Sequence, residues 1–376
     1  MIGIRVDANS IIATGHIMRC ITIARAIVRN GGSVTFFIAD EESALLLRKN
    51  AGELSDTNVV ILNSVWDDME SELPVLIEQI QLRGIDMLLV DSYKVTYDYF
   101  KAISRVCRTA YIDDLHEGIF PVDILINYSG YHDMFDYTSD YANMRGHGET
   151  TTRLLLGLMY APLREQFALD VGSHGTDVGG HGIKDILLAC GGGDTLGMIL
   201  PMMEVIADRG LVGSVADDSS VSKDEVEACK SGLIWHVVVG DYVENKEEIR
   251  AFASLHKGFV IHESVQDMAS LMRSCDLAVV AAGTMLTECA AIRLPAVFYQ
   301  VADNQKYGVQ YWSGPDRMIY AGDAIIDKSG VIASVIREVT SLMNDQNRLV
   351  NIQDKLGSIT DGHGAEKIAE ALLDRN

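Results

Sequence analysis

Residues 2–38 read IGIRVDANSIIATGHIMRCITIARAIVRNGGSVTFFI, and this stretch decides the fold class. The apolar run at 2–6 has the length and composition of a buried strand. From 17 to 28 the apolar residues recur at intervals of three and four, which predicts a helix with one apolar face. The glycine pair at 31–32 ends this helix, and 34–38 is a second apolar run. A strand, a helix and another strand in this order indicate two parallel strands covered by a helix.

The alternation of short apolar runs with amphipathic stretches continues along the chain. Further strands are expected at 59–62, 87–90, 110–112, 124–126, 186–189, 235–239, 260–261, 277–281 and 296–299. Helices are expected at 42–50, 67–82, 96–107, 196–207, 246–255, 268–275, 286–292, from about 305 onward, and at 365–373. The stretch 168–182 breaks the rhythm, because five of its fifteen residues are glycine, and it is predicted to be a linker.

This pattern predicts an α/β fold of two doubly wound, Rossmann-like domains that face each other across a cleft. The expected boundaries are an N-terminal domain at 1–167, the linker at 168–182, a C-terminal domain at 183–355 and a C-terminal helix at 356–376. Because the chain has 376 residues, each domain is long enough to bury a core of its own. Doubly wound folds bind ligands at the carboxyl ends of their strands, so functional residues are expected in the loops that follow the strands.

The charge and the cysteines limit the kinds of partner. The chain has 31 basic and 53 acidic residues, a net charge of −22, which disfavours binding to nucleic acid or to an anionic membrane. No run approaches the roughly 18 apolar residues of a membrane span, and the N-terminus has the pattern of a strand rather than of a signal peptide. The six cysteines are scattered without a CxxC pair, as expected of reduced thiols. These features predict a cytoplasmic protein, in which backbone N–H groups can still hold one small anion.

The first candidate site joins the first strand to the first helix. Asp7 follows the strand, Gly15 lets the backbone approach a ligand, and His16 opens the helix. Because the positive end of a helix dipole disfavours an imidazolium, His16 is expected to be neutral near pH 7 and able to accept a proton. The alternative is that His16 only caps the helix. A GxGxxG fingerprint is missing, so the motif does not indicate a nicotinamide nucleotide.

The second candidate is the run Gly191-Gly192-Gly193-Asp194-Thr195 between a strand and a helix. Consecutive glycines before a helix present backbone N–H groups that can hold a phosphate. A tight turn without a ligand is the alternative. The Lys-Ser/Thr pair of a P-loop is missing, so hydrolysis of a nucleoside triphosphate is not indicated.

Two more motifs of the second half follow strands. Ala282, Gly283 and Thr284 lead into a helix and offer a second set of N–H donors, and Glu288 lies one turn into that helix. A carboxylate at this position can accept hydrogen bonds from both hydroxyls of a ribose, or it is an ordinary solvated side chain. The run Ala302-Asp303-Asn304-Gln305 has polar amides that can bind a phosphate or a hydroxyl, or it is an N-cap.

A further candidate, in the first half of the chain, combines Val90-Asp91-Ser92-Tyr93 with Ile112-Asp113-Asp114-Leu115. Both runs follow strands of the first half, so they are expected at the same sheet edge as His16. Their side chains suit sugar hydroxyls or the capping of the next segment. The Asp113-Asp114 pair lacks the DxD spacing of a metal site, so no metal is expected.

Taken together, the motifs resemble one enzyme family. Arg5, Asp7, Gly15, His16 and Arg19 form a set that is similar to that of the UDP-2,4-diacetamido-2,4,6-trideoxy-β-L-altropyranose hydrolases of pseudaminic acid biosynthesis, which are grouped with spore-coat polysaccharide biosynthesis proteins. The likeness continues through LLVDSY, YIDDL, LLGLMYAPLREQF, the GG-x-D loop, VQDMASLMRSCDLAVVAAGTMLTE, ADNQ and DGHGAEKIA, and so covers nearly the whole chain. The second half also resembles glycosyltransferases of GT-B fold, such as the peptidoglycan N-acetylglucosaminyltransferase.

The resemblance implies a two-domain GT-B fold, a reaction without a metal ion or cofactor, and a nucleotide held by the C-terminal domain. It implies that His16 is the general base or positions the water. Thr284 and Glu288 match the phosphate and ribose contacts of the family, and Tyr93 with the Asp113-Asp114 pair matches its sugar side. One departure is that Ala13 stands where the family has the first glycine of Gly-x-Gly-His.

The resulting hypothesis is an inverting, metal-independent hydrolase of a UDP-linked N-acetylated deoxyhexose. The catalytic residue is His16, and the expected sugar-binding residues are Asp7, Arg19, Tyr93, Asp113 and Asp114. The expected nucleotide-binding residues are Gly192, Gly193, Asp194, Ala282, Gly283, Thr284, Glu288, Asn304 and Gln305. The departing UDP is expected to be stabilised by backbone N–H groups and not by a cation. The alternatives are a GT-B glycosyltransferase with a UDP-sugar donor and a catalytically silent nucleotide-sugar binding subunit; the oligomeric state stays open.

Overall fold

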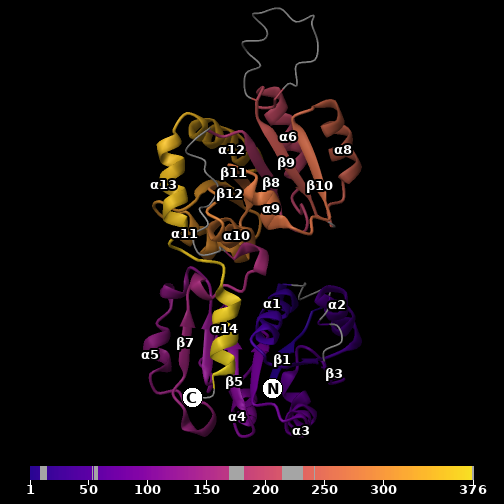
Figure 1. The fold of residues 1–376 in the computed structure, drawn as a ribbon, viewed down its shortest axis with the longest axis vertical. Coiled ribbons are helices and arrows are strands. Elements are labelled where there is room, and N and C mark those ends of the chain that lie inside the picture. The colour runs from indigo at the N-terminus through magenta and orange to yellow at the C-terminus, as the bar shows by residue number, and fades with distance from the viewer. Residues whose placement is uncertain are drawn as a thin grey trace, which may run out of the picture. The chain divides into compact units, whose positions relative to one another are not determined.

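The computed structural model describes residues 1–8, 15–52, 54, 58–168, 182–213, 232–240 and 242–374. The chain divides into two compact units, Met1–Glu165 with Gly362–Asn376, and Gln166–Asp361. Each unit contains one sheet of parallel strands (Figure 1). The replacement of a glycine by Ala13 and most of the expected linker lie outside the described residues.

The sheet of the first unit has seven strands in the order β3-β2-β1-β4-β5-β6-β7. The strands are β1 (Ile2–Val6), β2 (Val34–Ile38), β3 (Asn58–Ile61), β4 (Met87–Asp91), β5 (Arg108–Ile112), β6 (Ile124–Asn127) and β7 (Arg153–Leu156). Its α-helices are α1 (Gly15–Arg29), α2 (Glu41–Ala51), α3 (Leu73–Arg83), α4 (Tyr97–Ile103), α5 (Tyr137–Tyr141) and α14 (Gly364–Leu373). Neighbouring strands pair in parallel throughout, as β1 does with both β2 and β4.

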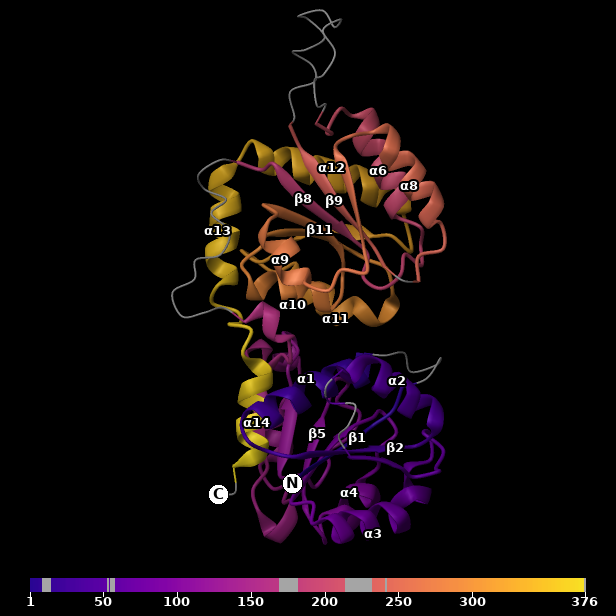
Figure 2. The same ribbon diagram turned by 45° about the vertical axis from the view of Figure 1, so that its right-hand side comes forward.

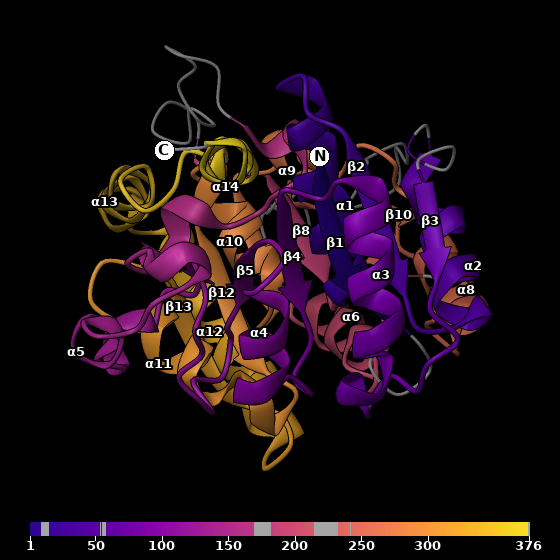
Figure 3. The same cartoon turned by 90° about the horizontal axis from the view of Figure 1, so that it is seen from below.

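Helices cover both faces of this sheet, because the strands are apolar on both sides. Ile4 and Val6 pack in one cluster with α1, α2 and α14, whereas Leu88 and Val90 pack in a second cluster with α3 and α4. Figure 2 shows α1 and α2 along one side of the strands and α3 and α4 along the other. Seen from below, α3 and α4 are the elements of this unit nearest to the viewer (Figure 3).

Several elements of the first unit differ from the sequence prediction. A helix was expected at 67–82, but its first part is a 3₁₀ turn at Met69–Glu72. The α-helix α3 begins only at Leu73 and has a proline in its first turn. The helix expected at 96–107 ends at Ile103. The sequence prediction did not include α5 and β7, because neither is long or strongly periodic. The C-terminal helix α14 packs its apolar stripe, including Ile368 and Leu372, into the cluster of α1.

The sheet of the second unit has six strands in the order β10-β9-β8-β11-β12-β13. The strands are β8 (Asp185–Ala189), β9 (Ile234–Val239), β10 (Phe259–Glu263), β11 (Leu277–Ala281), β12 (Ala296–Gln300) and β13 (Ile319–Asp323). Its α-helices are α6 (Ile199–Asp208), α8 (Lys246–Leu255), α9 (Met268–Arg273), α10 (Thr284–Ala291), α11 (Lys306–Trp312), α12 (Lys328–Met343) and α13 (Gln346–Leu356). In Figure 2, α6, α8 and α12 lie on one side of the strands and α9, α10 and α11 on the other.

Each sheet has a point at which the strand order changes direction. In the first unit this point lies between β1 and β4, and in the second unit it lies between β8 and β11. The loops that leave the two strands separate there, one to each face of the sheet, and leave a crevice in which doubly wound proteins bind their ligands. The first crevice is flanked by Asp7 and Asp91, and the second by Gly191 and Ala282.

In the part of the chain that the structure describes, no helix is both long and apolar enough to cross a membrane.

Candidate active site

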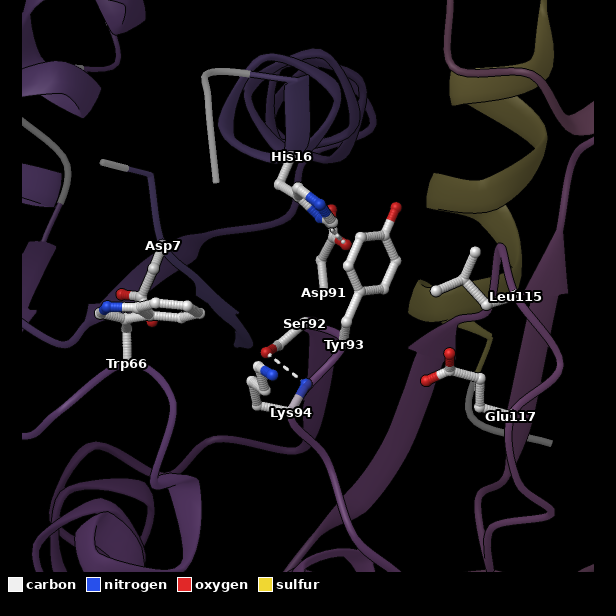
Figure 4. A pocket seen from close by; sticks show the side chains of 9 residues that line it. All are labelled: Asp7, His16, Trp66, Asp91, Ser92, Tyr93, Lys94, Leu115 and Glu117. Carbon is white, nitrogen blue, oxygen red and sulfur yellow. Dashed lines mark hydrogen bonds and ion pairs between the residues drawn. The ribbon is translucent and has the colours of Figure 1, made fainter. Parts of the chain in front are cut away.

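A cavity of about 400 Å³ opens at the β1–β4 crevice of the first unit. Nine residues line it, and all come from loops or element ends of this unit: Asp7, His16, Trp66, Asp91, Ser92, Tyr93, Lys94, Leu115 and Glu117 (Figure 4). Three of the residues that the sequence predicted, Asp7, His16 and Tyr93, therefore share one cavity.

His16 is the second residue of α1 and is buried, with its ring at the cavity. Its Nδ1 lies 2.6 Å from Oδ1 of Asp91, the last residue of β4. Nη2 of Arg19 also lies 3.0 Å from Nδ1. Because a carboxylate oxygen only accepts hydrogen bonds and the Asp91 contact is the shorter one, we assign the ring proton to Nδ1, which then donates to Asp91. No described residue hydrogen-bonds Nε2, which leaves this nitrogen for water or a ligand. The side chain of His16 is thus hydrogen-bonded to the end of β4 and does not cap its own helix, α1.

Arg19, one turn further along α1, fixes the position of Asp91. Its Nε donates to Oδ2 of Asp91 at 2.6 Å, and its Nη2 donates to Oδ1 at 2.5 Å. Burial by itself would raise the pKa of Asp91, but the charge and hydrogen bonds of Arg19, together with the hydrogen bond from His16, outweigh it and hold this pKa well below its usual range. Asp91 is therefore a carboxylate over the whole physiological pH range.

The same guanidinium also fixes the position of Tyr93, which packs against His16, through Asp114. Nη1 of Arg19 donates to Oδ2 of Asp114 at 2.6 Å and to the hydroxyl of Tyr128 at 2.5 Å. The hydroxyl of Tyr93 donates to the same Asp114 oxygen at 2.9 Å. The ring of Tyr93 then meets the ring of His16 edge to face, with 4.7 Å between the centroids. The Arg19 guanidinium is fully engaged within the protein, so it positions His16, Asp91 and Tyr93 instead of extending into the cavity.

Asp7 is tied to a buried ionic network beneath the cavity. Arg5 is fully buried, and its Nη1 donates to Oδ2 of Asp7 at 2.6 Å. Its Nε and Nη2 donate to the two carboxylate oxygens of Glu72, each at 2.7 Å. Oδ1 of Asp7 accepts from the N–H of Ala39 at 2.7 Å, and burial raises the pKa of Asp7. Asp7 lines the cavity, but both of its oxygens already have partners.

Asp113 does not line the cavity. Its side chain is buried, and its Oδ1 accepts from the N–H groups of Leu115 and His116 at 3.2 and 2.8 Å. Its Oδ2 accepts from the hydroxyl of Tyr137 at 3.0 Å. Asp113 therefore shapes the loop that carries Leu115 to the cavity.

In the second unit, the glycine run follows β8 at the β8–β11 crevice. Gly191 has a φ of +83°, and the loop packs so tightly against Gly240 that a Cβ there would lie 2.4 Å from the carbonyl oxygen of Gly192. No described residue accepts a hydrogen bond from the N–H of Gly192 or Gly193. Asp194 instead accepts from the N–H groups of Met198 and Ile199, at 2.7 and 2.8 Å.

The helix expected at 196–207 begins only at Ile199. Gly197 adopts a φ of +58° and donates to the carbonyl of Asp194 at 2.9 Å, so a turn separates the glycine run from α6. The sequence prediction placed the glycines directly before the helix. In the structure the N-cap of α6 is Met198, and the carboxylate of Asp194 accepts hydrogen bonds from the N–H groups of Met198 and Ile199 at the start of the helix.

The next predicted nucleotide residues lie at the start of α10. Gly283 is its N-cap and is open to solvent, with no atom within 4 Å of an added Cβ, and Thr284 is the first helical residue. The N–H of Ala282 donates to the carbonyl of Tyr299 at 2.7 Å, so this N–H is not available to a phosphate. Glu288 is half-buried, one turn into α10.

After β12, Asn304 and Gln305 lie in a 3₁₀ turn, Asp303–Gln305. Oε1 of Gln305 accepts from the N–H groups of Val301 and Ala302, at 2.9 and 3.2 Å, and so closes the loop on itself. Asn304 is exposed. Since β8, β11 and β12 are adjacent and parallel, their three loops lie at the same edge of the sheet.

The sequence prediction missed some of the cavity residues. Asp91 belongs to the predicted Val90–Tyr93 motif but is not among the predicted site residues, although its place at the end of a strand is a signal that could have identified it. Trp66, Lys94 and Glu117 lie in loops without a motif, so the sequence held no signal for them. Among the described residues, no group of three or more His, Cys, Asp or Glu side chains is arranged to hold a metal ion.

Solved structures with the same architecture identify the fold. MurG from Acinetobacter baumannii matches with a TM-score of 0.64 and 10% sequence identity over 99% of this chain and 98% of that chain. The UDP-GlcNAc 2-epimerase from Neisseria meningitidis bound to UDP-GlcNAc matches with a TM-score of 0.59 and 10% identity, over 99% of this chain and 100% of that chain. A glycosyltransferase from Rickettsia africae ESF-5 matches with a TM-score of 0.59 and 10% identity over 100% and 99%.

The chain has the GT-B fold. The fold expectation of two doubly wound α/β domains is thereby confirmed, whereas identities of this size do not identify the reaction. Residues 213–363 match the family described as "Protein of unknown function (DUF354)", which is less than half of the chain. No curated protein matches the sequence.

Proposed function

We propose that this protein hydrolyses a nucleotide-activated sugar to the free sugar and a nucleoside diphosphate, with inversion at the anomeric carbon. The observation that carries the proposal is the pair of His16 and Asp91 at the cavity. The substrate we propose is a UDP-linked N-acetylated deoxyhexose, and the process is the biosynthesis of pseudaminic-type sugars or surface polysaccharide. The motif resemblance supports the choice of sugar, and the UDP-GlcNAc of the Neisseria epimerase supports a UDP-sugar.

In the proposed reaction, Nε2 of His16 accepts a proton from water while the water oxygen bonds to the anomeric carbon. The bond between that carbon and the phosphate oxygen breaks, and its electron pair leaves with the nucleoside diphosphate. Asp91 holds the ring in the tautomer with a free Nε2 and stabilises the imidazolium that forms. Tyr93 and Asp114 are proposed to face the sugar. Tyr93 packs against His16, and its hydroxyl donates a hydrogen bond to Asp114.

We propose that the second unit holds the nucleotide at the β8–β11 crevice. Gly192, Gly193, Gly283 and Thr284 supply N–H groups for the phosphates, since these loops flank the point where the strand order changes direction. Glu288 is proposed to accept hydrogen bonds from the ribose hydroxyls. Asn304 is exposed at the same sheet edge and is the remaining polar side chain proposed for this site. Asp194 and Gln305 then shape the loops rather than contact the nucleotide.

The second candidate is a glycosyltransferase, in which an acceptor hydroxyl replaces the water. The fold matches to MurG and to the Rickettsia glycosyltransferase favour it. Both reactions need a base at His16, so the geometry of the pair fits either one.

The protein is incubated with a panel of UDP-, GDP- and CMP-linked sugars without an acceptor, and free sugar is detected by its mass. This experiment distinguishes the candidate functions. The hydrolase releases free sugar and nucleoside diphosphate in equal amounts. A transferase leaves the donor intact until an acceptor is added. A protein that binds UDP but turns over no donor, with or without a mixture of acceptors, is the silent binding subunit, and this result would refute the enzyme.

A further inference from the structure

The part of the cavity wall formed by Trp66 and Lys94 has no role in the reaction described above. Trp66 lies in the loop after β3, and Lys94 lies in the loop between β4 and α4. The Lys94 ammonium nitrogen lies 5.9 Å from the centroid of the Trp66 ring. In Figure 4 the side chains of His16 and Lys94 extend into the cavity from opposite sides.

The Lys94 ammonium has no counter-ion among the described residues, because none of their carboxylate oxygens lies within 4.0 Å of its Nζ. The charged groups that line the cavity with it are acidic, namely Asp7, Asp91 and Glu117. Asp7 is paired with Arg5 and Asp91 with Arg19, and Glu117 lies on the far side of Tyr93 (Figure 4). The face of Trp66 stabilises the cation and leaves its N–H donors directed to a ligand.

We infer that Lys94 binds the phosphate at the anomeric oxygen of a glycosyl phosphate, the leaving group of the reaction. The inference rests on the proposed function. In an inverting displacement the leaving group departs on the side opposite to the attacking water. In the proposed reaction His16 holds the water on one side of the cavity, and the side chain of Lys94 extends into the cavity from the other side (Figure 4).

The charge of the chain strengthens this inference. With a net charge of −22 and three acidic side chains at the cavity, the field there repels an anion unless a cation is close by. Lys94 supplies that cation in the first unit. This proposal differs from the sequence-based expectation, in which no cation contacts the departing UDP.

The test uses the tryptophan fluorescence of the full-length chain. Of its three tryptophans, Trp235 and Trp312 are buried, with 0% and 5% of their surface exposed, so that Trp66 reports on the cavity. Three probes are titrated separately: N-acetylglucosamine 1-phosphate, neutral N-acetylglucosamine and glucuronic acid. Binding of the sugar phosphate at least tenfold more tightly than the neutral sugar is expected, with a dependence on ionic strength.

Variants assign the effect to the ammonium. In Lys94→Gln the affinity for the sugar phosphate falls about tenfold or more, and Lys94→Arg restores most of it. The matched control is Lys101→Gln on α4, whose ammonium also lies 5.9 Å from an aromatic centroid, that of Tyr97, but does not line the cavity. It keeps the wild-type affinity. Calorimetry on the same variants replaces the fluorescence signal wherever Trp66 does not respond.

The outcomes are distinct. Equal affinity of wild type and Lys94→Gln for the sugar phosphate overturns the inference, and so does the absence of sugar phosphate binding. Preference for glucuronic acid over the sugar phosphate also overturns it, because the site would then bind a carboxylate on the sugar. Failure of the proposed function is observed separately, as the absence of turnover of any nucleotide-sugar. In that case, weaker binding of the sugar phosphate to Lys94→Gln still supports the anion site.

Discussion

Arg19 donates hydrogen bonds to both carboxylate oxygens of Asp91, at 2.6 and 2.5 Å, from a position 72 residues earlier in the chain. This bidentate contact is the centre of the candidate active site. It makes Asp91 a permanent carboxylate, and Asp91 in turn sets the tautomer of His16. The properties of the proposed base therefore depend on a residue that does not reach the cavity.

Arg19→Ala is expected to destabilise the protein by about 3–5 kcal/mol, because it leaves the Asp91 carboxylate buried without its main partner. Urea unfolding measures the free energy of unfolding. Arg29→Ala on the same helix is the control, since its partners Glu165 and Glu366 are at the surface, and it should change stability by less than about 1 kcal/mol. Equal stability of the two variants would contradict the role of Arg19.

Replacement of His16 by Ala or Asn is expected to lower turnover of the nucleotide-sugar about 100-fold or more, the range for loss of a general base. The affinity for UDP should stay near that of the wild type, because the proposed nucleotide residues belong to the other unit. Steady-state kinetics and calorimetry measure the two effects. His147→Ala, outside the cavity, is the control for a lost imidazole. A folded His16→Ala protein with wild-type turnover would exclude the mechanism.

Acid should destabilise the wild type through Asp91. The pKa of this group is lower in the folded than in the unfolded chain, so the unfolded chain binds more protons below about pH 5. The stabilisation from Asp91 is complete above its unfolded pKa, near 3.9, and is lost as the pH falls from there toward the folded pKa. Unfolding free energies between pH 3 and 7 should therefore fall less steeply for Asp91→Asn than for the wild type. Parallel curves for the two proteins would count against this ion pair.

Enzymatic activity should survive EDTA. No metal is part of the proposed mechanism, in which backbone N–H groups and Lys94 stabilise the departing phosphate. Turnover is measured after dialysis against the chelator and again after addition of Mg²⁺ or Mn²⁺. Activity that disappears with EDTA and returns with a divalent ion would refute the metal-free reaction.

Glu288→Ala is expected to weaken UDP binding and to raise KM while leaving kcat largely intact, since ribose contacts change little between ground and transition states. Two charge-assisted hydrogen bonds are worth roughly 1.5–3 kcal/mol each, less where water replaces them. Calorimetry with UDP and 2′-deoxy-UDP provides the check. The deoxy ligand should bind more weakly to the wild type and show little further loss in the variant. If Glu288→Ala binds UDP like the wild type, the ribose lies elsewhere.

Much of the fold could be predicted from the sequence. Strand and helix periodicity is a local property, so β1, α1 and β2 were found within a few residues of their bounds. Some errors occur where local patterns are weak: β7 and α5 are short, and the start of α6 is delayed by a turn at Gly197. The sequence prediction also did not include β13, α12 and α13, although α12 is long and has an apolar face. Tertiary packing alone assigns α14 to the first unit, since an amphipathic helix does not specify the surface that it covers.

The sequence by itself determined the two parallel sheets, because side-chain spacing decides which segments are strands. It also determined the loops that carry the candidate functional residues, because parallel strands share one carboxyl edge. The tertiary structure decided which side chains meet there. His16, Arg19 and Asp91 come together because α1 packs over β4, and Trp66 and Lys94 join the same cavity from unrelated loops. Such contacts depend on packing and side-chain conformation across tens of residues, which no local pattern records.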